Sequence, residues 1–167
     1  MVIWLIGLSG SGKTTVGKYL YRKIKSENPS TVLIDGDEIR EIFKHNIGND
    51  PYSVEGRKIN ADRITKLCSW LDNQGINVIC CILSIFEESR IWNRKNYSDY
   101  REIYLQTNNE TLSKRRTLYN DARKKLIKNV VGVDIPFIPP ENYDFTFNTD
   151  GNYSAEEIAQ EIFNNLS

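Results

Sequence analysis

The chain has 167 residues, and its 22 lysines and arginines balance 22 aspartates and glutamates, so the formal net charge is zero at pH 7. This length suffices for one compact domain, expected over residues 1–167, and the balanced charge argues against nucleic acid or an anionic membrane as partner. No apolar run approaches the roughly 20 residues that span a bilayer, and Met1 leads directly into an apolar stretch without a secretion signal, so we expect a cytoplasmic protein.

The first predicted strand, residues 2–6, leads into residues 7–14 (GLSGSGKT), which fit the phosphate-binding pattern G-x-x-x-x-G-K-[ST]. Glycines let backbone N–H groups turn inward around phosphate oxygens, and a helix expected over residues 15–25 points its positive end at them. We therefore expect Lys13 to reach the β- and γ-phosphates of ATP, and Thr14 to bind Mg²⁺. The other expected contacts to ATP in this stretch are Gly10, Ser11, Gly12 and Thr15.

Two carboxylates, Asp35 and Asp37, follow the second predicted strand at residues 32–34 and precede a helix expected over residues 37–44. A kinase needs one acid to hold Mg²⁺ or its water, and another to orient or deprotonate the accepting hydroxyl. Asp35 and Asp37 can supply these two groups, and the sequence leaves open which of the two is the base. The simpler alternative is an Asp cap of the helix.

The remaining elements continue an alternation of strands and helices. Strands are expected at residues 76–83, 102–105 and 145–147, and helices at residues 55–73, 87–94, 111–119, 122–128 and 154–164. Ser154 and Glu157 have the spacing of a capping box for the last helix. The pattern predicts an α/β fold of the P-loop NTPase type, with three α/β/α layers, a central parallel sheet and a short lid.

Two segments are predicted to be irregular, residues 45–53 and residues 129–143, because they are rich in turn formers and prolines. Long loops in a compact domain are usually functional, and here they would lie over the carboxyl ends of the strands. His45 is the only histidine, and we do not expect it to act as a base. The three cysteines, at positions 68, 80 and 81, are expected to be buried reduced thiols.

Several separated motifs together resemble the adenylylsulfate kinase family, whose members phosphorylate the ribose 3′-hydroxyl of adenylyl sulfate with ATP and Mg²⁺. The matching stretches are residues 7–15 (GLSGSGKTT), residues 34–40 (IDGDEIR), Tyr52-Ser53 with Arg57 and Asn60, Ser84 with Arg90, residues 118–123, and residues 132–139. The resemblance runs nearly from end to end. Because relatives commonly form dimers, it also implies a homodimer.

Carried over by residue, the resemblance implies that Asp35 serves magnesium and Asp37 the 3′-hydroxyl. It also implies that Arg40, Arg57 and Asn60 hold the anionic end and the ribose of the acceptor. A guanidinium offers a planar fork that suits tetrahedral oxyanions. Arg115 matches a lid arginine that would lie over ATP and stabilise charge on the moving phosphoryl group. The resemblance also assigns Ser84 and Arg116 to the acceptor site. Taken singly, an arginine such as Arg57 or Arg115 is more often a solvated helix charge.

The chain departs from the family at the base site, where Tyr52 and Val130 stand in place of two phenylalanines that clamp adenine. Stacking of a base is worth roughly 1–3 kcal/mol per ring, so loss of one aromatic face disfavours a purine. A smaller base fits better, as in the related cytidine diphosphoramidate kinases, and we narrowly favour cytidine diphosphoramidate over adenylyl sulfate as acceptor. Two alternatives stay open: a kinase for another small metabolite, such as a sugar acid or shikimate-like acceptor, and a non-catalytic module gated by ATP.

Overall fold

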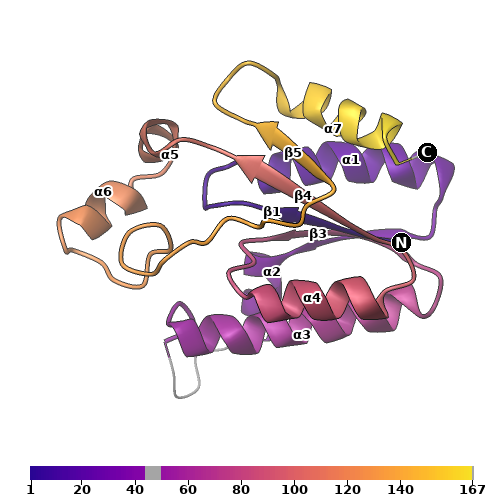
Figure 1. The fold of residues 1–167 in the computed structure, drawn as a ribbon, viewed down its shortest axis with the longest axis horizontal. Coiled ribbons are helices and arrows are strands. Elements are labelled where there is room, and N and C mark those ends of the chain that lie inside the picture. The colour runs from indigo at the N-terminus through magenta and orange to yellow at the C-terminus, as the bar shows by residue number, and fades with distance from the viewer. Residues whose placement is uncertain (44–49, 167) are drawn as a thin grey trace.

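The computed structural model describes residues 1–43 and 50–166, and its centre is a five-stranded parallel sheet (Figure 1). The strands are β1 (Val2–Ile6), β2 (Thr31–Asp35), β3 (Asn77–Ile82), β4 (Tyr100–Gln106) and β5 (Phe145–Asn148). Their order across the sheet is β2-β3-β1-β4-β5, so β1 pairs with β3 on one side and with β4 on the other. Each predicted strand is confirmed, with its ends shifted by two residues at most.

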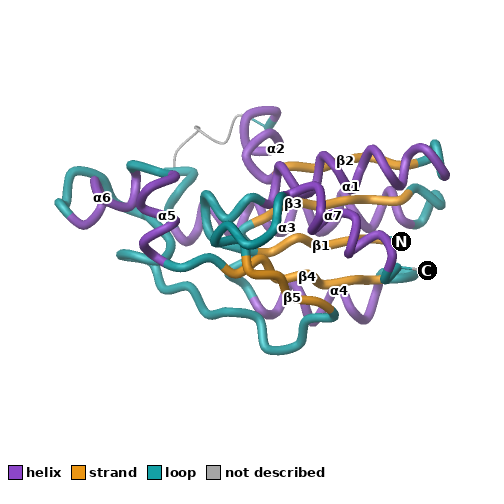
Figure 2. The backbone as a smooth tube through the Cα atoms, turned by 90° about the horizontal axis from the view of Figure 1, so that it is seen from above, coloured by secondary structure: helices purple, strands orange, loops and turns teal. Residues whose placement is uncertain are grey.

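The helices cover both faces of this sheet, which confirms the predicted three-layer α/β/α fold. They are α1 (Lys13–Glu27), α2 (Gly36–Ile42), α3 (Val54–Asp72), α4 (Glu87–Asn96), α5 (Asn109–Arg115), α6 (Leu118–Arg123) and α7 (Ala155–Asn164). Helices α1 and α7 lie over one face, and α3 and α4 over the other. The short helices α5 and α6 stand beyond the sheet, at the opposite end from both termini (Figure 2). Together with the loop that follows them, they form the lid, residues 109–135.

Strand β1 is buried along its whole length, as expected for the centre of a parallel sheet. Successive side chains point to opposite faces. Ile3 and Leu5 pack in the cluster that includes α1 and α7, whereas Trp4 and Ile6 pack in the cluster that includes α3. Burial on both faces therefore explains why this segment shows a continuous apolar run rather than an alternating one.

The predicted helices at residues 111–119 and 122–128 are wrong in their boundaries. The chain instead forms α5 and α6, separated at Arg116, whose backbone is extended (φ −140°, ψ 117°). Helix α6 ends at Arg123, and Lys125 then adopts a left-handed conformation with φ 59°. No glycine or proline marks either break, so the sequence carries no strong local signal for them.

The expectations for the cysteines and for the start of the last helix are confirmed. All three cysteines are buried and free of disulfides. Ser154 and Glu157 form the predicted capping box at the start of α7.

No helix within residues 1–43 and 50–166 is long and apolar enough to cross a membrane. His45, the end of the helix predicted at residues 37–44 and most of the loop predicted at residues 45–53 lie outside the described residues.

Candidate active site

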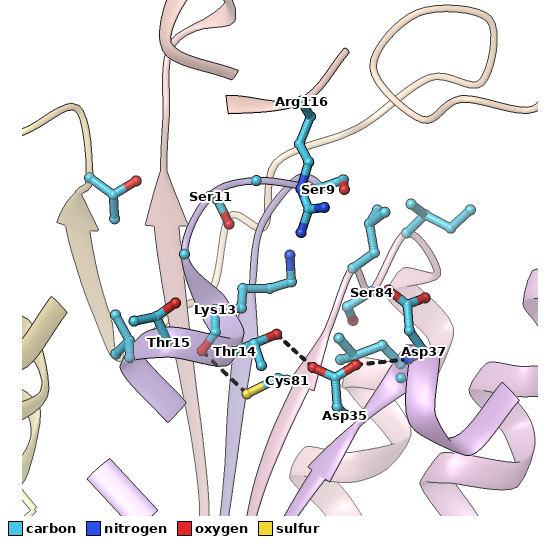
Figure 3. Close-up of a pocket in the computed structure, with 18 of the residues that line it drawn as sticks. Ser9, Ser11, Lys13, Thr14, Thr15, Asp35, Asp37, Cys81, Ser84 and Arg116 are labelled. Atoms are coloured by element: carbon cyan, nitrogen blue, oxygen red, sulfur yellow. Dashed lines mark hydrogen bonds between the residues drawn. The ribbon is translucent and has the colours of Figure 1, made fainter. Parts of the chain in front are cut away.

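A cavity of about 490 Å³ opens at the carboxyl ends of the strands, between the phosphate-binding loop, α2, the start of α3 and the lid helices (Figure 3). Most of the sequence-predicted site residues line it. They are Gly10, Ser11, Gly12, Lys13, Thr14, Thr15, Asp35, Asp37, Arg40, Arg57, Asn60, Ser84, Arg115 and Arg116. Tyr52 and Val130 are not among the lining residues. The fold therefore brings together residues that the chain separates by more than 100 positions.

The phosphate-binding loop is held by close backbone contacts. Gly10 and Gly12 have φ values of 85° and 91°, a region that favours glycine, and Gly12 is the N-cap of α1. At Gly7, an added Cβ would lie 2.5 Å from Ser11 Oγ and 2.7 Å from the Leu105 carbonyl oxygen. The buried Ser11 hydroxyl has no hydrogen-bond partner among the described residues, so it is free to serve a bound phosphate.

Lys13 lies inside the loop, and its Nζ donates a hydrogen bond to the Leu8 carbonyl at 2.8 Å. Burial removes the ammonium group from water and lowers the pKa of Lys13 to about 8, although Cys81, Asp35 and Asp37 act in the opposite direction. An ammonium group that is poorly solvated gains strongly from a polyanion placed beside it. Two of its three donors remain for that purpose.

Thr14 and Asp35 form the link between the loop and the neighbouring strand. Thr14 Oγ1 donates to Asp35 Oδ2 at 2.6 Å, and Asp35 Oδ1 accepts from the Asp37 backbone N–H at 2.9 Å. Asp35 is thus the N-cap of α2, so the simpler interpretation of the sequence is also correct. A hydroxyl and a carboxylate oxygen beside a phosphate loop fit Mg²⁺, which is commonly held by one or two protein oxygens together with substrate phosphates.

Asp37 and Arg40 form an ion pair on the first turns of α2. The Asp37 side chain is 83% exposed, whereas that of Arg40 is only 9% exposed. Arg40 Nε is buried without a hydrogen-bond partner among the described residues, which is costly for a charged group. The guanidinium lies 4.8 Å from the centre of the Tyr52 ring. This arrangement presents one exposed carboxylate and one fixed cation to the same cavity.

Arg57 and Asn60, one turn apart on α3, are both held by carbonyl groups. Arg57 donates to the carbonyl oxygens of Tyr52 at 2.8 Å and Asn129 at 2.9 Å, and Asn60 donates to that of Gly36 at 3.0 Å. Burial and the nearby Arg40 charge lower the pKa of Arg57. Tyr52 itself is 46% exposed, and its ring lies beside the two guanidinium groups.

Val130 lies in the lid, not at the cavity. Its side chain is 8% exposed and packs in a small cluster with Leu112, Tyr119 and Ala122. The structure therefore places Tyr52 next to the cavity and the Val130 side chain inside the lid. Contact of Val130 with a base stays a prediction from the resemblance.

Ser84 follows β3 and is fixed from two sides. Its backbone is left-handed, with φ 58°, and its hydroxyl oxygen accepts a hydrogen bond from Trp4 Nε1 at 3.0 Å. Arg90 donates to the Ser84 carbonyl at 2.8 Å and pairs with the buried Glu102 at 3.2 Å. An unusual conformation in a cavity wall is thus held by buried polar contacts behind it.

The lid residues reach the phosphate loop directly. Arg115 donates to the carbonyl oxygens of Gly10, at 3.2 Å, and Thr149, and the Tyr119 hydroxyl donates to the Ser9 carbonyl at 2.7 Å. Arg116 extends from the lid towards Lys13 (Figure 3). These contacts place two guanidinium groups at the edge of the phosphate site.

Sequence reasoning missed the wall that follows β5. Thr149, Tyr153 and Ile158 line the cavity, although no motif singled them out. The one signal available was positional, since Thr149 lies two residues after a predicted parallel strand, and ligands bind at the carboxyl ends of such strands.

Comparison with known proteins gives the same family. The family model described as "Adenylylsulphate kinase" matches residues 1–148. A cytidine diphosphoramidate kinase from Campylobacter jejuni is 40% identical, with 99% of this chain and 96% of that protein covered. An adenylyl-sulfate kinase from Thermodesulfovibrio yellowstonii is 35% identical, with 96% of this chain and 80% of that protein covered.

Among solved structures, the Mycobacterium tuberculosis APS kinase CysC in complex with AMPPNP and APS superimposes with a TM-score of 0.86 at 29% identity, covering 99% of this chain and 96% of that one. The sequence, the fold and the residues that line the cavity thus point to the same family. Because the family model covers most of the chain and relatives match it over nearly its full length, the chain belongs to the adenylylsulfate kinase family and is an ATP-dependent kinase.

Proposed function

We propose that residues 1–167 form one kinase domain that transfers the γ-phosphoryl group of ATP to the ribose 3′-hydroxyl of a nucleotide with a tetrahedral terminal group. The favoured acceptor is cytidine diphosphoramidate. The observation that carries this choice is the 40% identity to a cytidine diphosphoramidate kinase over 99% of the chain, against 35% and 31% for two adenylyl-sulfate kinases. The sequence-based prediction that Val130 replaces a phenylalanine of the adenine clamp favours the same choice.

On the phosphate side, Lys13 would neutralise the β- and γ-phosphates, and backbone N–H groups of residues 10–15 would hold their oxygens. Thr14 and Asp35 would hold Mg²⁺, which supplies charge neutralisation on the phosphates. Arg115 would stabilise charge on the moving phosphoryl group, as its place at the edge of the loop allows. Closure of the lid over these groups would exclude water and suppress hydrolysis of ATP.

On the acceptor side, Asp37 would orient the 3′-hydroxyl and take its proton, because its carboxylate is the exposed one of the two. Arg40, with a buried and unpaired Nε, would bind the terminal tetrahedral group. Arg57, Asn60, Ser84 and Arg116 would complete the acceptor site, and Tyr52 would stack on the base.

The test is consumption of ATP with cytidine diphosphoramidate and with adenylyl sulfate at equal concentrations, with the 3′-phosphorylated product identified by mass. We expect the cytidine compound to be preferred. Preference for adenylyl sulfate would overturn the choice of base and leave the kinase chemistry standing. That second candidate is favoured by the likeness to a solved APS kinase in complex with APS, at a TM-score of 0.86.

A kinase for a sugar acid would have no base for Tyr52 to stack on. Retention of full acceptor affinity in Tyr52→Ala would therefore weaken the nucleotide assignment. We also propose a homodimer, on family resemblance. Light scattering coupled to gel filtration tests it, and a mass of about 19 kDa, that of one chain, would contradict it.

A further inference from the structure

Two segments far apart in the sequence meet beside Arg57. Asn129 lies in the lid, and its side-chain amide donates to the carboxylate of Asp50, 79 residues away. The Asn129 carbonyl accepts a hydrogen bond from Arg57 at 2.9 Å, across 72 residues. One lid residue therefore contacts both the loop that precedes α3 and an arginine that lines the cavity.

The backbone of Asn129 is fixed from the other side. Its φ is 65°, in the left-handed region that asparagine tolerates better than most residues. The carboxylate of Asp134 accepts hydrogen bonds from the backbone N–H groups of Asn129 and Val130. With its N–H committed to Asp134, Asn129 directs its carbonyl and its side chain to the opposite segment.

The receiving segment is equally well fixed. The second carboxylate oxygen of Asp50 accepts a hydrogen bond from the Tyr52 backbone N–H at 2.9 Å. The backbone carbonyl of Asp50 accepts one from the Ser53 hydroxyl at 2.7 Å. An added Cβ at Gly56 would lie 2.4 Å from the Asp50 carbonyl oxygen, so this loop is pressed against the first turn of α3. The hydrogen bond from Asn129 to Asp50, the tie, therefore connects the lid to α3.

These contacts fix the orientation of the Arg57 guanidinium group. Its Nε donates to the Tyr52 carbonyl and one terminal nitrogen to the Asn129 carbonyl, so two of the three guanidinium nitrogens are held by backbone. An arginine has five N–H donors, and three remain for a ligand in the cavity. A guanidinium that is already oriented loses less conformational freedom when it binds an oxyanion.

We propose that Asn129 is a positioning residue that orients Arg57 for the acceptor and ties the lid to the acceptor side of the cavity. The inference rests on the proposed function in one respect, because the acceptor is taken to be a nucleotide with an anionic terminal group. ATP binding at the phosphate loop does not depend on this tie.

The first test is Asn129→Gly, since glycine keeps the left-handed backbone and removes the side-chain amide. The matched control is Lys125→Gly, another left-handed residue of the lid, with φ 59°. The variant loses the hydrogen bond to the charged Asp50 carboxylate, so the backbone carbonyl that orients Arg57 is no longer fixed. We expect the KM for the acceptor to rise about tenfold, with kcat and the KM for ATP within about twofold. The control should change none of the three. An unchanged acceptor KM in Asn129→Gly would overturn the proposal.

A second variant, Asp50→Asn, keeps an acceptor for the Tyr52 N–H and replaces the oxygen that faces Asn129 by an NH₂ group. If the two side chains act only through their hydrogen bond to each other, the acceptor KM of the double variant, Asn129→Gly with Asp50→Asn, should be no higher than that of either single variant. Additive increases in the acceptor KM would contradict this coupling.

Hydrogen exchange of the free protein separates this inference from the proposed function. Backbone amides of residues 129–135 should exchange faster in Asn129→Gly than in the wild type, whatever the acceptor is. Unchanged exchange would refute the tie even if the wild type phosphorylates cytidine diphosphoramidate. Faster exchange with no turnover of either acceptor would refute the proposed function alone.

Discussion

The two sides of the cavity are built in different ways. The phosphate side comes from one continuous stretch, residues 7–15, and its shape depends on glycine backbone at the end of the central strand β1. The acceptor side comes from α2, α3 and the lid, and side-chain hydrogen bonds across more than 70 residues hold it together. The phosphate side therefore binds a group that is common to all ATP-dependent kinases. A few substitutions can alter the acceptor side without disturbing the phosphate side. The first three predictions below test this difference, the last concerns stability alone, and they run from the largest expected effect to the smallest.

Asp37→Asn should reduce kcat by about 10²–10⁴-fold, because the amide cannot take the proton of the accepting hydroxyl. The dissociation constant of ATP, measured by calorimetry, should stay within about twofold, since Asp37 lies on the acceptor side. Glu38→Gln, at the next and also exposed position of α2, serves as the control and should retain turnover. Equal losses of turnover in both variants would contradict a specific role for Asp37.

Tyr52→Ala should raise the KM for the acceptor roughly 5–100-fold and leave the KM for ATP unchanged. The reason is the loss of a ring that lies beside Arg40 and Arg57 and would stack on the base. Tyr52→Phe keeps the ring and should stay within about twofold of the wild type in steady-state kinetics. A rise in the KM for ATP instead would mean that the two sides are not independent.

The affinity for ATP should fall as the pH rises above about 8. The pKa of Lys13 in the free protein is about 8, below the usual 10.5, because the group is buried. Since ATP binds the protonated lysine, each pH unit above that value should raise the dissociation constant about tenfold until the pKa of the bound state is reached. Lys13→Arg, which stays charged, should remove this dependence, and a pH-independent wild type would contradict the assignment.

The smallest expected effect is on stability alone. Ser154→Ala removes the N-cap of α7 and should lower the free energy of unfolding by about 1 kcal/mol, as measured by urea denaturation. Both KM values should stay within about twofold of the wild type, because Ser154 itself does not line the cavity, although its neighbours Tyr153 and Ala155 do. Ser26→Ala, at an exposed serine near the end of α1, is the control and should change stability less. A change in either KM would show that α7 influences the cavity.

The sequence alone predicted the strands, the phosphate loop and the carboxylates at the end of β2. Each depends on local patterns: a buried apolar run, glycines before Lys13, and acids after a strand. It also predicted about half of the residues that line the cavity, because the family motifs keep fixed spacing within the chain.

Only the tertiary structure decided the partners of side chains that meet across the cavity. The break between α5 and α6 at Arg116, the burial of Val130 in the lid and the two carbonyl partners of Arg57 have no local signal. Nor does the entry of Tyr153 into the cavity wall. The physical reason is that backbone conformation is biased by neighbouring residues, whereas a contact such as Asp50 with Asn129 exists only after the lid has packed against the rest of the chain.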